Sequence, residues 1–586
     1  MMQSPPQALI RQAGPPPDNY VTHLVKSHIR RFVGLGIGAS LVVTAACSDD
    51  SDANGADGTD GAEPVEQPTE PAGWPTLGYD LGNSRAAMGE TILGTDNVAA
   101  LQPTWELSDV DGVTGTPIVA DSVLYIGDWT GNVRALDAET GEQIWNRDLE
   151  TARVQAAVAL DDQRVFVGTF DPRMVALDRD TGEKLWEAPL DDHPQAAIFG
   201  SPIHVDGALV VGVGGFENMI GTDTPTFRGS VVALDAATGD ELWRYWTTEA
   251  DDTEGPGVSV WSTPAVDLDR GHIYVGTGQH YAPPASDRSD AVIALDLTTG
   301  EELWVHQFTA GDVWSMAELD AGLDADVGAP PNLFQVGDTD AVGAGDKDGV
   351  YKALDRDTGE ELWSTELTEG GLQGGVMASA AVEGDSVYLT SNKASTAADL
   401  FALDRDSGDI RWQTDIGGQV VGPVTWANGV VYVADNTGHI SGFDAETGDL
   451  LWSYETEAQA AGGIAVVDGT VYGGYGWWLL GAPDDAKGGL IAFRLDDDEV
   501  VAGSGVAGGD QASGPDVYRQ SCATCHGATG DGGTAPALIG VDDQLTLDET
   551  REIVRQGRGQ MPGWAQTLSS EAIEAVVDYV RSEFAE

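Results

Sequence analysis

The chain has 586 residues, of which 96 are acidic and 29 basic, giving a formal net charge of −67 at pH 7. The length exceeds that of one ordinary domain and allows a large repeat-built domain beside a small one. Because the negative charge is spread along the whole chain, it argues against nucleic acid and anionic membrane surfaces as partners. The same charge indicates an acidic, solvated surface suited to a salty milieu, although an ordinary secreted acidic protein is equally compatible.

The N-terminal residues 1–46 have the pattern of an export signal. Lys26 and the pair Arg30-Arg31 precede an apolar run of small residues that is short for a membrane span and ends at Cys47. The residues before Cys47 are similar to a bacterial lipobox, so we expect Cys47 to carry lipid after signal cleavage. The protein would then be anchored on the periplasmic or outer face of the cell envelope. A plain secretory signal is the alternative, and the choice between general and twin-arginine export stays open.

Residues 47–73 predict a flexible acidic tether, because they are rich in Asp, Glu, Gly and Pro and contain no aromatic residue.

An internal repeat occupies residues 74–497. Its unit is Ala-Leu-Asp-x-x-Thr-Gly-x-x-x-Trp, with close variants, and it recurs seven times, with 40 to 61 residues between successive aspartates. The seven aspartates are Asp137, Asp178, Asp235, Asp296, Asp355, Asp404 and Asp444.

The repeat predicts a mainly β fold, an eight-bladed β-propeller. Segments such as 122–127 and 429–433 alternate β-branched or aromatic residues and suit the inner strands of a blade. We expect Asp-x-x-Thr-Gly to form a tight turn and each Trp to pack between blades. An eighth unit is implied by Trp105, and residues 490–493 would complete its blade and close the ring. Seven blades is the alternative.

A linker at 498–513 precedes a small domain at 514–586, which contains Cys522-Ala-Thr-Cys525-His526. This spacing lets two thiols bind the haem vinyl groups while the histidine ligates the iron. A zinc site is excluded because no further Cys or His follows. Met561 is the only methionine of this region and is the expected sixth iron ligand.

The helices expected around this motif agree with an all-α cytochrome c domain. Thr546 and Glu549 occupy capping-box positions for a helix over 546–556 that stops at Gly557. A closing helix places an apolar stripe on one face. The stripe consists of Ile573, Val576, Val577 and Val580. The region resembles class I cytochromes c.

Several motifs in the propeller region resemble those of the pyrroloquinoline quinone (PQQ) dehydrogenases, most closely the polyvinyl alcohol dehydrogenase-like quinohaemoproteins. The segments that carry the resemblance are 74–85, 227–229, 260–264, 275–279 and 346–349. The sequence predicts no strand-turn-helix unit with a Gly-x-Gly-x-x-Gly motif that could bind NAD or FAD. The resemblance implies that PQQ is the electron source for the haem.

The resemblance also implies which residues hold PQQ. Trp261, which lies outside the repeat, would stack on the flat quinone, and Lys347 would contact the quinone carbonyls. Gly215 and Arg153 would line the cofactor, with Gln155 as a further neighbour. A loop aromatic in the core is the alternative for Trp261.

A calcium ion would bridge the protein and the quinone. Its ligands would be Glu217, Asp326 and Gln279, where Gln279 stands in place of the family's asparagine. Asp326 is the expected base, and Asp312 and Asp324 are competitors in a loop that differs from the family pattern. Many relatives hold a disulfide near the quinone, which this chain lacks the cysteines to form.

The expected function is that of a PQQ-dependent alcohol dehydrogenase using Ca²⁺ and haem c, with a small or polymeric alcohol as substrate. Polyvinyl alcohol or a secondary alcohol is a candidate substrate, and a soluble or membrane-bound acceptor would take the electrons onward. The main alternative is a non-catalytic propeller lipoprotein of the outer-membrane assembly scaffold type, fused to an electron-carrier cytochrome. A propeller that has lost its redox function is an intermediate possibility.

Overall fold

The computed structural model describes residues 73–495, except 223, 250–252, 318–321, 372–373, 394–396 and 477–486. In the C-terminal region it describes residues 518, 522, 526, 536–541, 545–558 and 570–584. Among these residues, no helix has the length and apolar character needed to cross a bilayer.

The described part of residues 73–495 forms eight sheets, each built around four antiparallel strands. The first four sheets comprise β3 (Ile118–Ala120), β4 (Val123–Gly127), β5 (Asn132–Asp137) and β6 (Gln143–Asp148); β7 (Ala159–Leu160), β8 (Arg164–Gly168), β9 (Arg173–Asp178) and β10 (Lys184–Pro189); β11 (Ala196–Ala197), β12 (Ile203–Val205), β13 (Ala208–Gly215), β14 (Ser230–Asp235) and β15 (Glu241–Trp246); and β16 (Ala265–Asp267), β17 (His272–Gly276), β18 (Ala291–Asp296) and β19 (Glu302–Gln307).

The other four sheets follow the same pattern, and two of them include a strand from the N-terminal end of the described chain. They comprise β20 (Asn332–Val336), β21 (Thr339–Gly345), β22 (Val350–Asp355) and β23 (Glu361–Glu366); β24 (Ala381–Glu383), β25 (Ser386–Lys393), β26 (Ala397–Asp404) and β27 (Ile410–Asp415); β28 (Thr425–Ala427), β29 (Val430–Ala434), β30 (His439–Asp444) and β31 (Leu450–Glu455) with β1 (Ala86–Ala87); and β32 (Ile464–Val467), β33 (Thr470–Tyr475), β34 (Gly488–Arg494) and β2 (Gln102–Val110).

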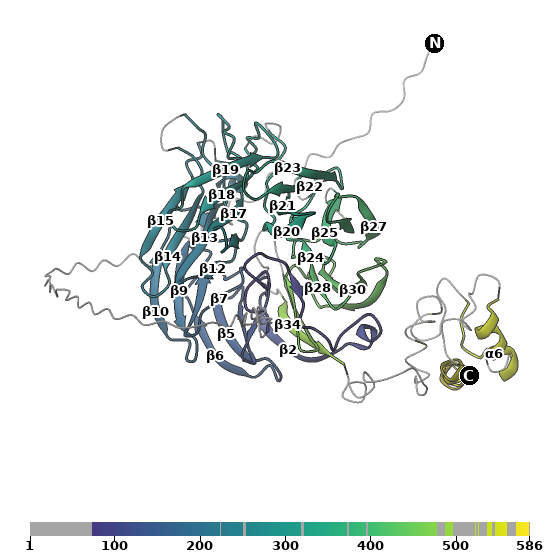
Figure 1. The fold of residues 1–586 in the computed structure, drawn as a ribbon. Coiled ribbons are helices and arrows are strands. Elements are labelled where there is room, and N and C mark those ends of the chain that lie inside the picture. Colours follow the sequence, from purple (N-terminus) through teal and green to yellow (C-terminus); the bar gives the residue numbers. More distant parts are fainter. Residues whose placement is uncertain are drawn as a thin grey trace, which may run out of the picture. The chain divides into compact units, whose positions relative to one another are not determined.

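These sheets are the blades of an eight-bladed propeller, which confirms the predicted fold class and excludes seven blades. Figure 1 shows the blades around a common centre, with β7, β12, β20 and β24 near it and β10, β15 and β27 at the periphery. The second strands are buried on both faces, as in β29, whereas the outermost strands such as β31 alternate exposed and covered residues. Inner strands therefore read as continuous apolar runs because each blade packs between two others.

The repeated turn and tryptophan join neighbouring blades, as the sequence predicts. Asp137 accepts hydrogen bonds at Oδ1 from the backbone amide (2.8 Å) and hydroxyl (2.9 Å) of Thr140. Trp145 donates from Nε1 to the carbonyl oxygen of Arg179 in the next blade (3.0 Å). A Cβ atom at Gly182, in that blade's turn, would lie 2.6 Å from the Trp145 ring, so only glycine fits there.

The ring closes through the pairing of β2 with β34, which places Trp105 opposite Ala492. The predicted eighth blade is therefore built from both ends of the propeller sequence. Trp105 donates from Nε1 to the carbonyl oxygen of Ala138 in the following blade (3.3 Å), and Trp452 donates to that of Leu101 (3.2 Å). The junction without a repeat turn thus keeps the same tryptophan contact.

The segment around Asn83 and Arg85 ties several blades together. Asn83 donates from Nδ2 to the carbonyl oxygen of Pro331 (3.0 Å), and Arg85 donates to those of Val424 (2.6 Å) and Ile464 (3.1 Å). Both side chains are fully buried. Burial lowers the pKa of Arg85 to about 9. The motif that carried part of the family resemblance is therefore a structural anchor.

The described C-terminal residues include α6 (Leu547–Gln556) and α7 (Ser570–Glu583). Thr546 and Glu549 form the predicted capping box, and Gly557 follows the last turn of α6. The apolar stripe expected on the closing helix is buried in α7. Both predicted helices are confirmed.

Candidate active site

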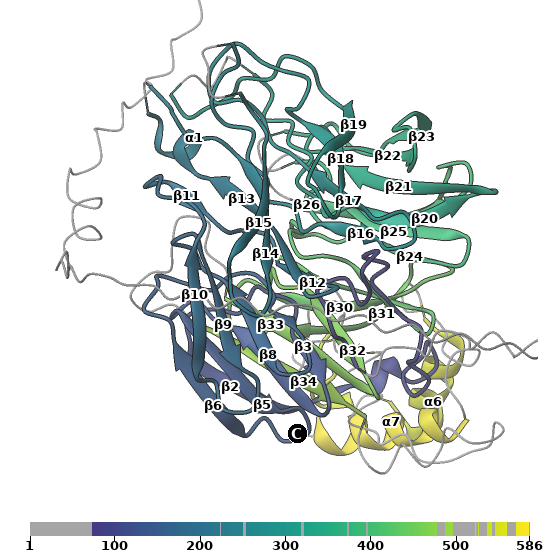
Figure 2. The same ribbon diagram turned by 60° about the vertical axis from the view of Figure 1, so that its left-hand side comes forward.

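The loop-and-helix segment after β13 positions Glu217, the predicted calcium ligand. Helix α1 (Glu217–Ile220) begins directly beyond the end of β13 (Figure 2). Glu217 is buried, and its Oε2 accepts hydrogen bonds from the backbone amides of Thr226 (2.7 Å) and Phe227 (2.8 Å). Its Oε1 lies 3.8 Å from Nε2 of His193. One carboxylate oxygen is therefore fixed by the backbone, and the other faces away from those amides.

Trp261 lies beside Lys347, with Nζ of the lysine 5.6 Å from the indole ring centroid. The indole is half-buried, and the backbone of Gly328 packs against its edge. A Cβ atom at Gly328 would come within 1.7 Å of the Trp261 ring atoms, so no larger residue fits there. The ring is thus held in place by backbone rather than by a neighbouring blade's repeat turn.

Lys347 is buried and pairs with two carboxylates. Its Nζ lies 2.5 Å from Oδ2 of Asp326 and 3.0 Å from Oδ2 of Asp324. Burial acts to lower the pKa of Lys347, but the carboxylates of Asp326 and Asp324 outweigh it and raise the pKa. The lysine therefore stays charged between the two acids. We call Lys347, Asp324 and Asp326 the lysine cluster.

Gln279 joins the lysine cluster from the segment that follows β17. Its backbone amide donates to Oδ1 of Asp326 (2.9 Å), and its side-chain Nε2 donates to Oδ1 of Asp324 (2.9 Å). Both carboxylates are therefore held from two sides. Burial raises the pKa of Asp324 to about 7, and the charge of Lys347 opposes that rise. Asp324 therefore takes up a proton more readily than an exposed aspartate does.

Asp312, the third candidate base, anchors the loop backbone. It accepts hydrogen bonds at Oδ1 from the amide of Leu323 (2.9 Å) and at Oδ2 from the amide of Ala325 (2.8 Å). Because both oxygens are engaged by the loop that carries Asp324 and Asp326, Asp312 is placed to hold that loop rather than to meet a substrate.

Gly215 and Tyr281 connect Glu217 with the lysine cluster. The Tyr281 hydroxyl donates to the carbonyl oxygen of Gly215 (2.8 Å), and Gly215 directly precedes the segment with Glu217. Burial raises the pKa of Tyr281, and the carboxylates of Asp326 and Glu217 raise it further. Tyr281 was not predicted from the sequence, although it lies two residues beyond Gln279, the last residue of the motif at 275–279.

Asp290 is a second residue that the sequence did not reveal. It is fully buried, and neither carboxylate oxygen has a hydrogen-bond partner among the described residues. The hydroxyl of the adjacent Ser289 donates instead to the carbonyl oxygen of Ser286 (3.2 Å). Burial raises the pKa of Asp290 well above its ordinary value, and the nearby charges of Asp326 and Asp312 raise it further. In the sequence it is one of 96 acidic residues, and no motif sets it apart from the others.

Arg153 is sandwiched between two aromatic rings. Its guanidinium carbon lies 4.0 Å from the ring centroid of Phe170 and 4.6 Å from that of Trp129. Its Nε is buried and has no hydrogen-bond partner among the described residues, and burial lowers the pKa of Arg153 to about 10. Phe170 in turn stacks on Phe216, the residue before Glu217, at 5.4 Å. A desolvated cation of this kind fits an anionic ligand such as PQQ, which carries carboxylates.

The described residues do not by themselves complete a calcium site. Calcium takes about six to eight oxygen ligands. Among the described residues, no three Asp, Glu, His or Cys side chains are grouped as metal ligands. Oε1 of Glu217 and the amide oxygen of Gln279 have suitable chemistry, but Asp324 and Asp326 are already paired with Lys347. An ion here would need further oxygens, from water or from a bound cofactor.

The C-terminal region contains an apolar pocket that fits haem. Backbone hydrogen bonds from Cys522 to Tyr518 (2.9 Å) and from His526 to Cys522 (3.0 Å) have helical spacing and put these residues on one face. Cys522 and His526 line the pocket together with apolar residues. These include Leu538, Val541, Leu545, Ile553, Val554, Val576, Val577 and Val580.

The histidine is oriented to ligate iron. Nδ1 of His526 lies 2.8 Å from the carbonyl oxygen of Pro536, so Nδ1 must carry the proton and donate it. The lone pair of Nε2 is then available to a metal, which is the usual arrangement of a metal-bound histidine. Cys525, Met561 and Cys47 lie outside the described residues, and their predicted roles stay predictions.

Comparison with known proteins identifies the propeller. Residues 74–370 match the family described as "Glucose/ethanol/alcohol dehydrogenase, beta-propeller domain", which is half of the chain. The chain belongs to this family. The match includes Arg153, Glu217, Trp261, Asp326 and Lys347. Residues 346–521 also match "Outer membrane protein assembly factor BamB", and residues 509–580 match "Cytochrome C oxidase, cbb3-type, subunit III". The C-terminal cytochrome c domain is confirmed, and its match begins within the predicted linker.

Relatives of this family member include named dehydrogenases. It is 28% identical over 438 residues to a polyvinylalcohol dehydrogenase of Pseudomonas sp., covering 64% of this chain and 66% of that protein. It is 30% identical over 341 residues to quinohemoprotein alcohol dehydrogenase ADH-IIG of Pseudomonas putida, covering 50% and 45%. The alignments therefore span less than two thirds of either relative.

A solved structure shares the fold. The quinohemoprotein alcohol dehydrogenase of Comamonas testosteroni superposes with a TM-score of 0.61 at 21% identity, covering 87% of this chain and 95% of that one. This likeness supports the eight-bladed propeller. It does not by itself assign the activity.

Proposed function

We propose that this protein is an exported quinohaemoprotein dehydrogenase, which oxidises an alcohol with bound PQQ and passes the electrons to its own haem c. Membership of the alcohol dehydrogenase propeller family and the cytochrome c domain support this proposal. The observation that carries it is the buried lysine cluster beside Trp261, because it brings two acids, one ammonium group and a half-buried flat indole together at one place.

The residues of the chain divide the work of binding. Trp261 offers a flat apolar surface for the quinone. Arg153, whose Nε has no hydrogen-bond partner among the described residues, offers a cation for a carboxylate. Lys347 supplies a further positive charge next to Trp261. When bound, PQQ supplies an electrophilic quinone that accepts the two electrons of the alcohol.

The base is proposed to be the Asp324–Asp326 pair, with Asp326 as the residue first favoured by the sequence. The two acids share one ammonium group, which holds their carboxylates side by side. A pKa of about 7 for Asp324 suits a group that takes a proton from an alcohol at neutral pH. Lys347 would keep the pair oriented and limit its negative charge after substrate binding.

Calcium and haem complete the proposed cofactor set. Glu217 and Gln279 would contribute oxygens to Ca²⁺, with the remainder supplied by the quinone. Haem c, held by Cys522, Cys525 and His526 with Met561 as sixth ligand, supplies a one-electron acceptor of raised potential.

The substrate and location belong to the same proposal. The names of two similar proteins, both polyvinylalcohol dehydrogenases, favour polyvinyl alcohol or another secondary alcohol as substrate. The N-terminal signal favours export and lipid attachment at Cys47 on the periplasmic or outer face of the envelope. A soluble or membrane-bound carrier would accept the electrons.

The test uses full-length, haem-loaded protein supplied with PQQ and Ca²⁺. Addition of a secondary alcohol is expected to reduce the haem, seen in its visible absorption, and to sustain dye reduction that depends on PQQ. Removal of divalent ions with a chelator is expected to lower the rate. Haem-loaded protein that binds no PQQ and oxidises no alcohol contradicts the proposal and favours the scaffold or the redox-inactive propeller.

A further inference from the structure

Three buried residues, each two positions from a residue of the candidate active site, meet at one place. They are Gly215, which precedes Glu217; Ser259, which precedes Trp261; and Tyr281, which follows Gln279. The three segments belong to two blades, because Gly215 ends β13, whereas Ser259 lies between β15 and β16 and Tyr281 follows β17 (Figure 2). Contacts among the three residues therefore join segments that the sequence keeps apart.

The three residues form a closed circuit of hydrogen bonds. The backbone amide of Gly215 donates to Oγ of Ser259 (3.0 Å), and the hydroxyl of Tyr281 donates to the carbonyl oxygen of Gly215 (2.8 Å). The hydroxyl oxygens of Ser259 and Tyr281 are 2.5 Å apart. Because the Tyr281 proton is used on Gly215, the serine donates in this last contact. We call this arrangement the glycine circuit.

The side chain of Phe227 holds Gly215 from another direction. A Cβ atom at Gly215 would lie 2.7 Å from the Phe227 ring, so no larger residue fits there. The Phe227 ring stacks on that of Tyr281 with centroids 6.1 Å apart, and the Phe227 amide donates to Oε2 of Glu217 (2.8 Å). The circuit and this aromatic pair together fix the end of β13, from which the chain continues to Glu217.

Backbone hydrogen bonds extend the same connection to the lysine cluster. The amide of Val258 donates to the carbonyl oxygen of Gln279 (2.9 Å), and the amide of Gly278 donates to that of Ser259 (2.9 Å). These two bonds pair the Ser259 segment with the Gln279 segment, whose own amide donates to Asp326. A change in the glycine circuit would therefore move the lysine cluster relative to the end of β13.

We infer that Ser259 and Tyr281 are positioning residues, which through the glycine circuit set the spacing of the three segments that would hold the quinone and its cation. This inference rests on the proposed function. Neither hydroxyl needs to touch the cofactor, because both donate within the circuit. Groups that orient the residues around a ligand typically change its affinity about 10- to 100-fold.

The experiment measures the affinity for PQQ by equilibrium dialysis of the full-length, haem-loaded protein with Ca²⁺ and without alcohol. Tyr281→Phe keeps the ring that packs on Phe227 and removes only the hydroxyl. Ser259→Ala removes the other hydroxyl of the circuit. Each change should raise the Kd for PQQ about tenfold or more, because the three segments are no longer held at one spacing.

The matched control is Tyr472→Phe. The Tyr472 hydroxyl is also buried in the propeller and donates to a backbone carbonyl oxygen, that of Ala138 (2.9 Å), between two other blades. Its removal costs the fold a hydrogen bond of the same kind and should leave the Kd for PQQ unchanged. An unchanged Kd in both circuit variants, or an equal rise in Tyr472→Phe, would overturn the inference.

A second measurement needs no cofactor. Amide hydrogen exchange of the same protein without PQQ reports how firmly the segments 214–218 and 256–282 are held. Both should exchange about fivefold faster in Tyr281→Phe, as expected from the loss of one buried hydrogen bond, and at the wild-type rate in Tyr472→Phe. Wild-type protein that binds no PQQ contradicts the proposed function, and the exchange rates then decide the positioning role alone. Unchanged exchange in Tyr281→Phe overturns that role whether or not PQQ binds.

Discussion

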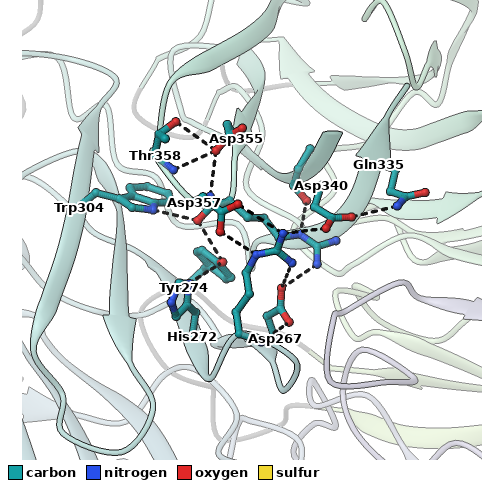
Figure 3. A network of polar contacts seen from close by, with 12 residues as sticks. Asp267, His272, Tyr274, Trp304, Gln335, Asp340, Asp355, Asp357 and Thr358 are labelled. Carbon is teal, nitrogen blue, oxygen red and sulfur yellow. Dashed lines mark hydrogen bonds and ion pairs between the residues drawn. The ribbon is translucent and has the colours of Figure 1, made fainter. Parts of the chain in front are cut away.

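Arg270 and Lys347 are two of the propeller's cations that pair with more than one carboxylate, and they do so differently. Arg270 contacts Asp267 (3.1 Å), Asp340 (2.7 Å) and Asp357 (2.8 Å), and this network joins the blade of β16–β19 to the blade of β20–β23 (Figure 3). Lys347 contacts Asp324 and Asp326 in the lysine cluster. Its side chain is 11% exposed, against 24% for Arg270.

The pKa shifts of the paired acids differ in sign between the two places. In the Arg270 network, hydrogen bonds lower the pKa values of Asp340 and Asp357, so these acids stay ionised at any physiological pH. In the lysine cluster, burial raises the pKa of Asp324 to about 7. Arginine offers five donors in a fixed plane, enough for every acid around it, whereas the lysine serves two buried acids with one ammonium group. The first arrangement is suited to holding blades and the second to exchanging protons.

The largest expected effect comes from removing the lysine. Lys347→Gln should lower kcat/KM for alcohol by about 10²-fold or more, because the acid pair loses the charge that orients it. It should also destabilise the fold by about 3–5 kcal/mol, since two buried carboxylates lose their partner. Steady-state kinetics and denaturant unfolding measure both effects.

The control for this variant is Lys352→Gln, which removes a lysine of the same blade that pairs with exposed Glu361 (2.9 Å). That change should leave kcat/KM unaltered and shift stability by less than about 1 kcal/mol. If Lys347→Gln keeps activity within a few-fold of wild type, the lysine cluster is a structural ion pair like that of Arg270.

A smaller effect is expected at Asp290, whose buried carboxylate has no hydrogen-bond partner among the described residues. Because its folded-state pKa is raised, the folded protein binds this proton more tightly than the unfolded chain does. Wild-type stability is then highest below the unfolded pKa of about 4 and falls as pH rises towards the folded pKa. Asp290→Asn removes that loss, so the variant should gain stability relative to wild type as pH rises from 5 to 8.

Thermal unfolding across this pH range measures the difference. The matched control is Asp385→Asn, since Arg411 lowers the pKa of exposed Asp385 to about 2 and no titration falls in the range. Its effect on the melting temperature should not vary between pH 5 and 8. A constant difference for Asp290→Asn as well would mean that Asp290 is ionised throughout.

The same contrast explains what the sequence predicted. The blades were predictable because each repeat tryptophan, such as Trp145, follows its turn at a fixed spacing, and this spacing recurs along the chain. The closing pair of Trp105 with Ala492 was predictable because one unit was left without its turn. The residues of the lysine cluster were predicted only from the resemblance to a known family. Asp290 and Tyr281 were not predicted. Their significance depends on contacts between segments far apart in sequence or on burial, neither of which local composition reveals.

The smallest expected effect is the loss of stability on removing Arg270. Its dependence on salt concentration should differ from that of the loss in Lys347→Gln. Arg270→Gln should lower stability by about 1–2 kcal/mol, because exposed pairs contribute little singly and Asp267 keeps its contact with Arg356 (2.9 Å). Alcohol oxidation should be unchanged. Since Arg270 is partly exposed, raising the salt concentration from 0.1 to 1 M should screen most of this loss, whereas the loss in Lys347→Gln should persist because its acids are buried. An Arg270 effect that resists salt would place its charges in the same class as those of the lysine cluster.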